Sequence, residues 1–294
     1  MDGDIHPDRI CGHILRDSLC IDGYIQTSGV VDFAYSTKNP QTPLAYCEIR
    51  AMHSRLELIL VGTDESGARR LCREAEATVS DLERKFDRHN PESPVSVLNA
   101  GKKADGIDDE LYFALELCEQ FRMMTEGYFD IAALSDSRHR PAYSLEPSAH
   151  GARFASEGTM LDFGGFAKGY ALERIRKDLN DAGITKALLN FGNSSVVGIG
   201  THPFGDCWKV SSEKTGSTFD LVDSAVSISG RTPDGRDHIV DPHSAMPVAH
   251  GMDIAVTGRS ALVCEMLSTA VYAAPEAVRK SIMASFEGYE IKNG

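Results

Sequence analysis

The stretch LDFGGFAKGYALERIRKDL, residues 161–179, joins an extended segment to a glycine turn and then to a run with helical spacing. Gly164 and Gly165 form the turn, and Lys168 begins a helix that is predicted to end near Ala182. A glycine turn lets the backbone approach a ligand, and the first turn of a helix offers unpaired N–H groups. A lysine is unfavourable at that position by itself, so an anion beside Lys168 is one explanation. A tight strand-to-helix turn with a solvated lysine is the other.

The segments on either side of this turn have clear periodicities. Leu56, Leu58 and Leu60 alternate as in a strand, and the apolar residues from 71 to 86 have helical spacing. A second helix is predicted from Asp108 to Gly127, a loop over 90–101 and a strand over 159–163. After the glycine turn and its helix, five short strands are predicted, at 185–192, 195–200, 207–212, 218–223 and 225–229. Two helices over 260–286 and a last strand over 289–292 follow them.

The order of these elements predicts an α+β fold. Helices and runs of strands are segregated along the chain, and the five short strands favour a meandering antiparallel sheet. One domain is expected over residues 44–294. An irregular N-terminal arm is expected over residues 1–43, where proline, glycine and polar residues are mixed.

Composition excludes some classes of function and suggests a location. The net charge of −13 argues against a nucleic-acid partner, because neutralising phosphates needs a basic face. No run reaches the roughly 18 to 20 apolar residues of a membrane span. The first residues lack a basic-then-apolar signal segment, so a cytoplasmic location is expected for the chain as given, and a periplasmic or lipid-anchored one if such a segment was removed. Seven scattered cysteines without a CxxC pair favour reduced thiols.

A second candidate region is GRTPDGRDHIVDPHSAMP, residues 230–247. His238 and Asp241 lie around a short apolar step just before a proline, as in a rigid loop that presents side chains into a cleft. A histidine here could transfer protons or contact a ring system, and a carboxylate could hold its tautomer. A surface turn with incidental charges is the alternative reading.

The third candidate is the apolar segment ALVCEMLSTAVYAA, residues 261–274. Glu265 and Thr269 stand four residues apart and share one helix face. A carboxylate and a hydroxyl on a buried face are the kind of oxygen ligands that Mg²⁺ uses, together with carbonyls, phosphates and water. The alternative is a threonine bonded to its own helix backbone and a glutamate that reaches solvent.

Together these stretches resemble the ApbE-like flavin transferases, the FAD:protein FMN transferase family. The segments DFGGFAKGYA and HIVDP in this order are the specific ones. Supporting matches run from about Ala51 to Ala273: AMHSRLEL, FDRHNPESPVSVLNA, GYFDIAAL, LLNFGNSSVVGIG, SISG and EMLSTAVY. The resemblance implies an ApbE-like α+β fold, with mixed or antiparallel sheets and flanking helices around a flavin-nucleotide cleft. FAD would be the substrate, with Mg²⁺ at its pyrophosphate.

The resemblance also implies a role for each matching residue. Mg²⁺ would be held by the carbonyl of Gly165 and the side chains of Glu265 and Thr269. The implied catalytic residues are His238 near the flavin and the reacting phosphate, Asp241 supporting the loop of His238, and Lys168 approaching the cofactor. The implied cofactor-binding residues are Met52, Asn99, Asp130, Asp162, Gly164, Gly165, Lys168 and His238.

In this family FMN is transferred from FAD to a Thr or Ser hydroxyl of a target protein, and AMP is released. The expected partner is therefore an acceptor flavoprotein or flavoprotein subunit. Two alternatives remain open: a non-catalytic paralogue that binds FAD or FMN, and a metal-dependent FAD pyrophosphatase that releases FMN and AMP.

The chain differs from the family pattern at several positions near the expected cleft. Glu265 stands where the family has aspartate, and Asn193 and Ala245 stand where it has glycine. His53 and Ser54 replace a Gly-Thr pair, and the Pro-Thr expected after Asp130 is absent from the sequence. Because Glu265 carries an additional methylene, Glu265→Asp is expected to preserve or raise metal-dependent activity.

Overall fold

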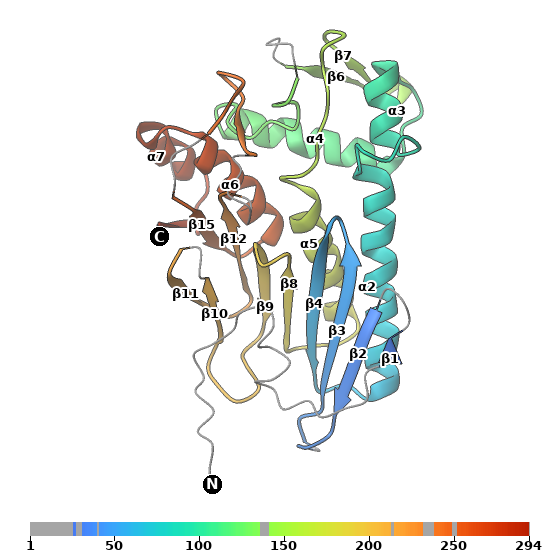
Figure 1. Ribbon diagram of the computed structural model, residues 1–294, viewed down its shortest axis with the longest axis vertical. Helices are drawn as coiled ribbons and strands as arrows, with labels where there is room; N and C mark the ends of the chain where they lie inside the picture. The colour runs from blue at the N-terminus through green and yellow to red at the C-terminus, as the bar shows by residue number, and fades with distance from the viewer. Residues whose placement is uncertain are drawn as a thin grey trace.

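The computed structural model describes residues 26–27, 31–39, 41–135, 141–212, 215–231, 238–248 and 252–293. Within these ranges one large sheet contains β1 (Gln26–Thr27), β2 (Val31–Ser36), β3 (Leu44–Ala51), β4 (Ser54–Val61), β8 (Ala187–Phe191), β9 (Ser195–Ile199), β12 (Ser224–Ser229), β15 (Ile254–Gly258) and β16 (Glu290–Asn293). The strands lie side by side in that order, and every neighbouring pair is antiparallel (Figure 1).

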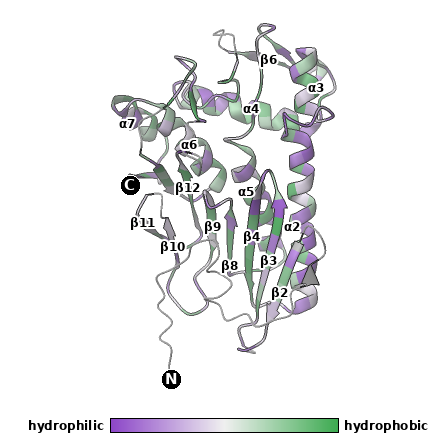
Figure 2. Ribbon diagram, viewed as in Figure 1, coloured by the Kyte–Doolittle hydropathy of each residue, from purple (hydrophilic) through white to green (hydrophobic). Residues whose placement is uncertain are grey.

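Helices cover one face of this sheet (Figure 1). They are α2 (Glu65–Phe86), α5 (Ala167–Asp181) and α6 (Ala261–Ala273), with α3 (Pro94–Gly101), α4 (Asp109–Met124) and α7 (Glu276–Ala284) further from the strands. Alternation along β4 turns Leu56, Leu58 and Leu60 into the same core as Leu71 and Ile175 of the helices. Figure 2 shows hydrophobic residues along the strands and many hydrophilic ones on α2, as expected for an amphipathic helix on a sheet.

The opposite face of the sheet carries a second, smaller core. The hairpin of β10 (Trp208–Ser212) and β11 (Ser217–Leu221) packs Trp208 and Phe219 with Val196 and Val226 of the sheet. Two further small sheets lie outside: β5 (Lys103–Ala104), β6 (Tyr143–Glu146) and β7 (Gly151–Phe154), with the 3₁₀ turn Pro147–Ala149, and the pair β13 (Val240–Asp241) and β14 (Met246–Pro247). Among the described helices, none is both long and apolar enough to cross a bilayer.

The predicted α+β class and the main helices are confirmed. The five short strands after the glycine turn do not form one meander: β8, β9 and β12 lie in the large antiparallel sheet, whereas β10 and β11 form a separate hairpin, so β9 pairs directly with β12. Three local predictions also differ. The predicted loop over 90–101 contains α3, because the Ser93 hydroxyl caps the helix and Pro94 occupies its first turn. Residues 159–163 form no strand among the described residues. Residues 31–36, predicted as part of an irregular arm, form β2 beside β3. Residues 1–25 of that arm lie outside the described part of the chain.

Candidate functional site

A cavity of about 470 Å³ lies between the N-terminus of α5, the helix α6 and the turn that joins β8 to β9. Its lining contains most of the residues singled out in the sequence: Asp130, Asp162, Gly164, Gly165, Lys168, His238, Glu265 and Thr269. These residues come from four separate parts of the chain. The structure therefore brings the three candidate regions together around one space, while the individual roles of these residues remain predictions.

The close crossing of α5 and α6 builds the centre of this cavity. A Cβ atom on Gly169 would lie only 2.8 Å from Glu265 Cβ and 2.9 Å from the carbonyl oxygen of Ala261, so the two helix backbones touch. Lys168, one residue earlier, reaches across with its Nζ 2.7 Å from Glu265 Oε1. Since only 5% of the Glu265 side chain is exposed, this ion pair is largely shielded from water.

The predicted metal ligands lie together at the same crossing. A Cβ on Gly165 would be 3.1 Å from Thr269 Oγ1, so the glycine leaves room for the hydroxyl beside its backbone. Among the described residues, no group of three or more His, Cys, Asp and Glu side chains is suited to a metal ion. A cation at this crossing would depend on one carboxylate, one hydroxyl and one carbonyl. Such an all-oxygen set fits Mg²⁺, which usually completes its shell with phosphate oxygens and water.

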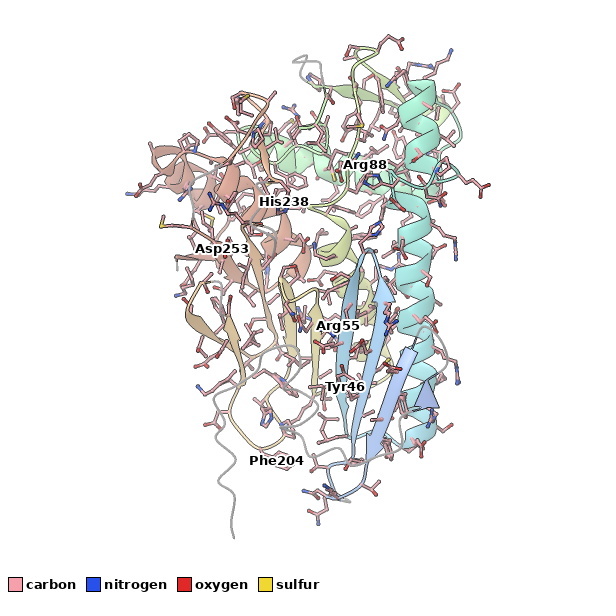
Figure 3. The ribbon with its side chains drawn as sticks, viewed as in Figure 1. Tyr46, Arg55, Arg88, Phe204, His238 and Asp253 are labelled. Atoms are coloured by element: carbon pink, nitrogen blue, oxygen red, sulfur yellow. The ribbon has the colours of Figure 1, made fainter. Side chains whose placement is uncertain are left out.

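Asp162 holds the glycine turn in place. Its Oδ1 accepts the N–H of Gly164 at 2.7 Å, and its Oδ2 accepts from Arg88 Nε, also at 2.7 Å. Arg88 comes from the segment after α2 and lies at the same end of the sheet as His238 (Figure 3). The carboxylate thus ties the start of α5 to the end of α2, which makes it a support of the turn as well as a lining residue.

A smaller cavity of about 210 Å³ adjoins the first and contains Met52. The two cavities share Asp162, Gly164 and Lys168 in their linings. Phe86, Arg88 and His89 are also among the lining residues of the second cavity. The predicted residue Met52 therefore lies beside the main cavity, separated from it by the glycine turn.

Two other predicted cofactor residues act on loops. The amide of Asn99 donates to Leu161 O at 3.0 Å and accepts from Leu161 N at 2.8 Å, as a strand partner would. The Asn99 side chain thus takes the place of a strand partner for the Leu161 backbone, in a segment that joins no sheet among the described residues. Asp130 Oδ1 accepts the N–H of Ala132 at 2.8 Å and so stabilises its own turn at the cavity wall. Asn99 itself is absent from the described lining of either cavity.

His238 lines the main cavity, whereas Asp241 lines a different cavity of about 430 Å³. The oxygens of Asp241 accept from the backbone N–H of His243 at 2.9 Å and from Ser244 Oγ at 2.7 Å. The ring of His243 in turn lies 3.0 Å from the Glu126 carbonyl oxygen. These contacts agree with a supporting role for Asp241 in the loop that carries His238.

The positions that replace family glycines keep a backbone conformation that favours glycine. His53, Asn193 and Ala245 have φ values of 54°, 54° and 58°. Asparagine tolerates this left-handed region better than most residues, and the Asn193 side chain also accepts from Asn190 Nδ2 at 2.8 Å. Asn193 therefore fits the left-handed conformation of the turn between β8 and β9, and its side-chain amide lies at the cavity wall, where a glycine would have no side chain.

Sequence reasoning missed several lining residues. Three of them alternate along the chain: Ser227 and Ser229 lie at the end of β12, and Arg231 lies two residues after it. The alternating serines of the AVSISG motif were a usable signal, since they place two hydroxyls on one face of an apolar strand. Tyr128 also lines the cavity, and burial, together with the charges of Asp241 and Glu126, raises the pKa of its phenol.

Comparison with known proteins agrees with this arrangement. The pattern of the ApbE family matches residues 47–291. A curated FAD:protein FMN transferase from Klebsiella pneumoniae (strain 342) is 25% identical over 203 residues, which cover 61% of this chain and 62% of that protein. The match thus spans somewhat less than two thirds of the relative's length.

Solved structures show the same fold. The apo flavinyl transferase ApbE of Pseudomonas stutzeri superposes with a TM-score of 0.72 at 20% identity, covering 86% of this chain and 95% of that one. The flavin transferase ApbE of Vibrio cholerae gives 0.71 at 15% identity, covering 86% and 97%. An ApbE protein of Thermotoga maritima gives 0.72 at 20% identity, covering 85% and 94%. With the family pattern matched over most of its length, the chain belongs to the ApbE family.

Proposed function

We propose that this protein transfers FMN from FAD to a Thr or Ser hydroxyl of an acceptor protein, with Mg²⁺, and releases AMP. The observation that carries the proposal is the meeting of the glycine turn, Lys168, Glu265, Thr269 and His238 around one cavity in a chain of the ApbE family. The family's substrate is FAD, and its protein acceptor follows from the same membership.

The paired cavities suit a ligand with two ring systems joined by a diphosphate. Lys168 and the Gly164 backbone belong to the wall that both cavities share. The N-cap residue of α5 is Phe166, whose side chain has no hydrogen-bonding group for the first turn. A diphosphate beside this wall would therefore meet a cationic side chain and the positive end of a helix dipole.

Gly165, Glu265 and Thr269 are the residues that would hold Mg²⁺. When bound, the cation would neutralise charge on the diphosphate and favour displacement at phosphorus. Lys168, already oriented by Glu265, would add a second positive charge, and the rigid glycine turn would hold the diphosphate in line with the attacking hydroxyl. In the overall reaction the acceptor oxygen bonds to the flavin-side phosphorus, the bridging P–O bond breaks, AMP leaves, and the hydroxyl proton is lost.

His238 is the residue proposed to take up that proton. It lies in the lining of the cavity on a segment that Asp241 and His243 brace from outside. A neutral imidazole is suited to accept a proton near neutral pH. The acceptor protein would close the open side of the cavity and exclude water from it. Transfer to the acceptor hydroxyl would then be favoured over hydrolysis.

The test is incubation of the purified protein with FAD and Mg²⁺, with and without a domain that carries an acceptor threonine, followed by intact-mass analysis and product chromatography. The expected result is an acceptor mass increase equal to one FMN phosphoester, which disappears with chelator or with Thr→Val at the acceptor position. Free FMN and AMP without labelling would replace the proposal by an FAD pyrophosphatase. Intact FAD recovered with the protein would replace it by a non-catalytic flavin-binding protein.

A further inference from the structure

Three buried serines surround Glu265. Ser195 lies on β9, Ser227 on β12 and Ser268 on α6, and their exposed fractions are 0%, 2% and 1%. Hydroxyls in such positions are costly to bury unless they are hydrogen-bonded. Each of the three is bonded to another serine, to Glu265 or to both. We call Ser195, Ser227 and Ser268 the serine clamp.

The serine clamp closes on a single residue. Ser195 Oγ donates to Glu265 Oε2, and Ser227 Oγ lies 3.2 Å from Ser195 Oγ. Ser268 Oγ lies 3.2 Å from Ser227 Oγ and 3.0 Å from the backbone carbonyl oxygen of Glu265. The chain of hydroxyls therefore begins at the carboxylate of Glu265 and returns to the main chain of the same residue.

The proton positions in this chain follow from its end point. An ionised carboxylate only accepts, so the one proton of Ser195 points to Glu265. Ser195 must then accept from Ser227, and Ser227 from Ser268, whose proton is shared between Ser227 and the Glu265 carbonyl. Ser268 in turn accepts from Ser229 Oγ, 2.9 Å away, so Ser229 extends the chain by one hydroxyl. The hydroxyl dipoles of Ser195 and Ser227 are therefore oriented toward the negative charge, which strengthens both bonds in a site shielded from water.

We propose that Ser195, supported by Ser227 and Ser268, is a positioning residue that fixes the carboxylate of Glu265 for cation binding. This inference rests on the proposed function, because it takes Mg²⁺ as the cation. A glutamate has three side-chain torsions, and ordering them costs conformational entropy unless neighbouring groups already hold the side chain. Ser195 fixes one oxygen and Lys168 the other. Each oxygen has two lone pairs, so one remains on each for a metal ion.

The test is titration of FAD-free protein with Mg²⁺ by calorimetry, in a double-mutant cycle of Ser195→Ala and Glu265→Asp. Loss of a supporting residue typically weakens metal binding about 10–100-fold, and we expect Ser195→Ala to do so in the wild-type background. In the Glu265→Asp background the shorter carboxylate is withdrawn from Ser195. In that background Ser195→Ala is expected to weaken Mg²⁺ binding by less than about threefold.

Two controls separate positioning from a general loss of stability. Ser195→Cys leaves no cavity, since its side chain is slightly larger than that of serine, but its thiol is a weak donor, and it should weaken Mg²⁺ binding as Ser195→Ala does. Ser36→Ala removes another buried serine, on β2 at the far side of the sheet, and should leave Mg²⁺ affinity unchanged. Melting temperatures measured in chelator show whether each variant is folded.

The outcomes distinguish this inference from the proposed function. An equal loss of affinity for Ser195→Ala in both backgrounds, or no loss in either, overturns the positioning role even if the wild type labels its acceptor. Wild-type protein that binds no Mg²⁺ overturns it as well. The predicted coupling together with an absence of FMN transfer would support the clamp and refute the transferase.

Discussion

Gly169→Ala tests the helix crossing on which the whole site depends. In an exposed helix this change would stabilise by about 1 kcal/mol, because glycine is a poor helix former. Here the new methyl would meet Glu265 Cβ at 2.8 Å and, at 2.9 Å each, the Ala261 carbonyl oxygen and Leu262 Cα. Two of these neighbours are backbone atoms and cannot rotate away, so the upper part of the usual 1–3 kcal/mol for overpacking applies.

The two effects of Gly169→Ala give a net destabilisation of about 2 kcal/mol, or roughly 4 °C in melting temperature for a chain of this size. Gly101→Ala is the matched control, since Gly101 lies at the end of α3 with no atom within 4 Å of an added Cβ. Thermal and urea denaturation would be followed by circular dichroism, and Gly101→Ala should be neutral or stabilising. A Gly169→Ala variant as stable as the Gly101→Ala variant would falsify the close crossing, and with it the contact of Lys168 with Glu265.

Three further changes have defined outcomes. Thr269→Val, nearly the same shape without the oxygen, should weaken Mg²⁺ binding about tenfold or more with the fold intact, and unchanged affinity in a titration would contradict its role as a ligand. Ala245→Gly should raise the free energy of unfolding by about 0.5–1 kcal/mol because it relieves a left-handed alanine; a decrease in urea denaturation would argue against that conformation. Burial, and next the charge of Lys186, lowers the pKa of His202 in the folded state, so folding stability is lost as the pH falls below the ordinary value of about 6.5. The melting temperature of His202→Gln should therefore fall less than that of the wild type between about pH 7.5 and 5.5, and equal falls would refute this cause.

Local patterns in the sequence predicted the parts of the site that depend on local spacing. The glycine turn and its helix are contiguous, and Glu265 and Thr269 share a face because they are four residues apart on α6. Asp162 and Lys168 could be assigned to one cleft because the turn between them is short. Short connections predicted the antiparallel pairs β8–β9 and β10–β11, but not the pairing of β4 with β8 or of β9 with β12.

Contacts between distant residues could not be predicted in this way. Ser195 and Glu265 are 70 residues apart, and Asn99 and Leu161 are 62 apart. Such contacts depend on how strands and helices pack against one another, and the spacing of apolar residues along one sequence carries no information about that packing. The missed helix α3 has a different cause: its serine cap and first-turn proline are also typical of loops, and eight residues offer little periodicity.

The central claim is that FMN leaves FAD for a protein hydroxyl, and the ratio of two products tests it most directly. After incubation with FAD, Mg²⁺ and an acceptor domain, AMP would be quantified by chromatography and protein-bound FMN by intact mass in the same sample. We expect one AMP for each FMN attached to the acceptor, and neither product when a chelator is present. AMP in excess with FMN free in solution, or no AMP at all while FAD remains bound, would contradict it.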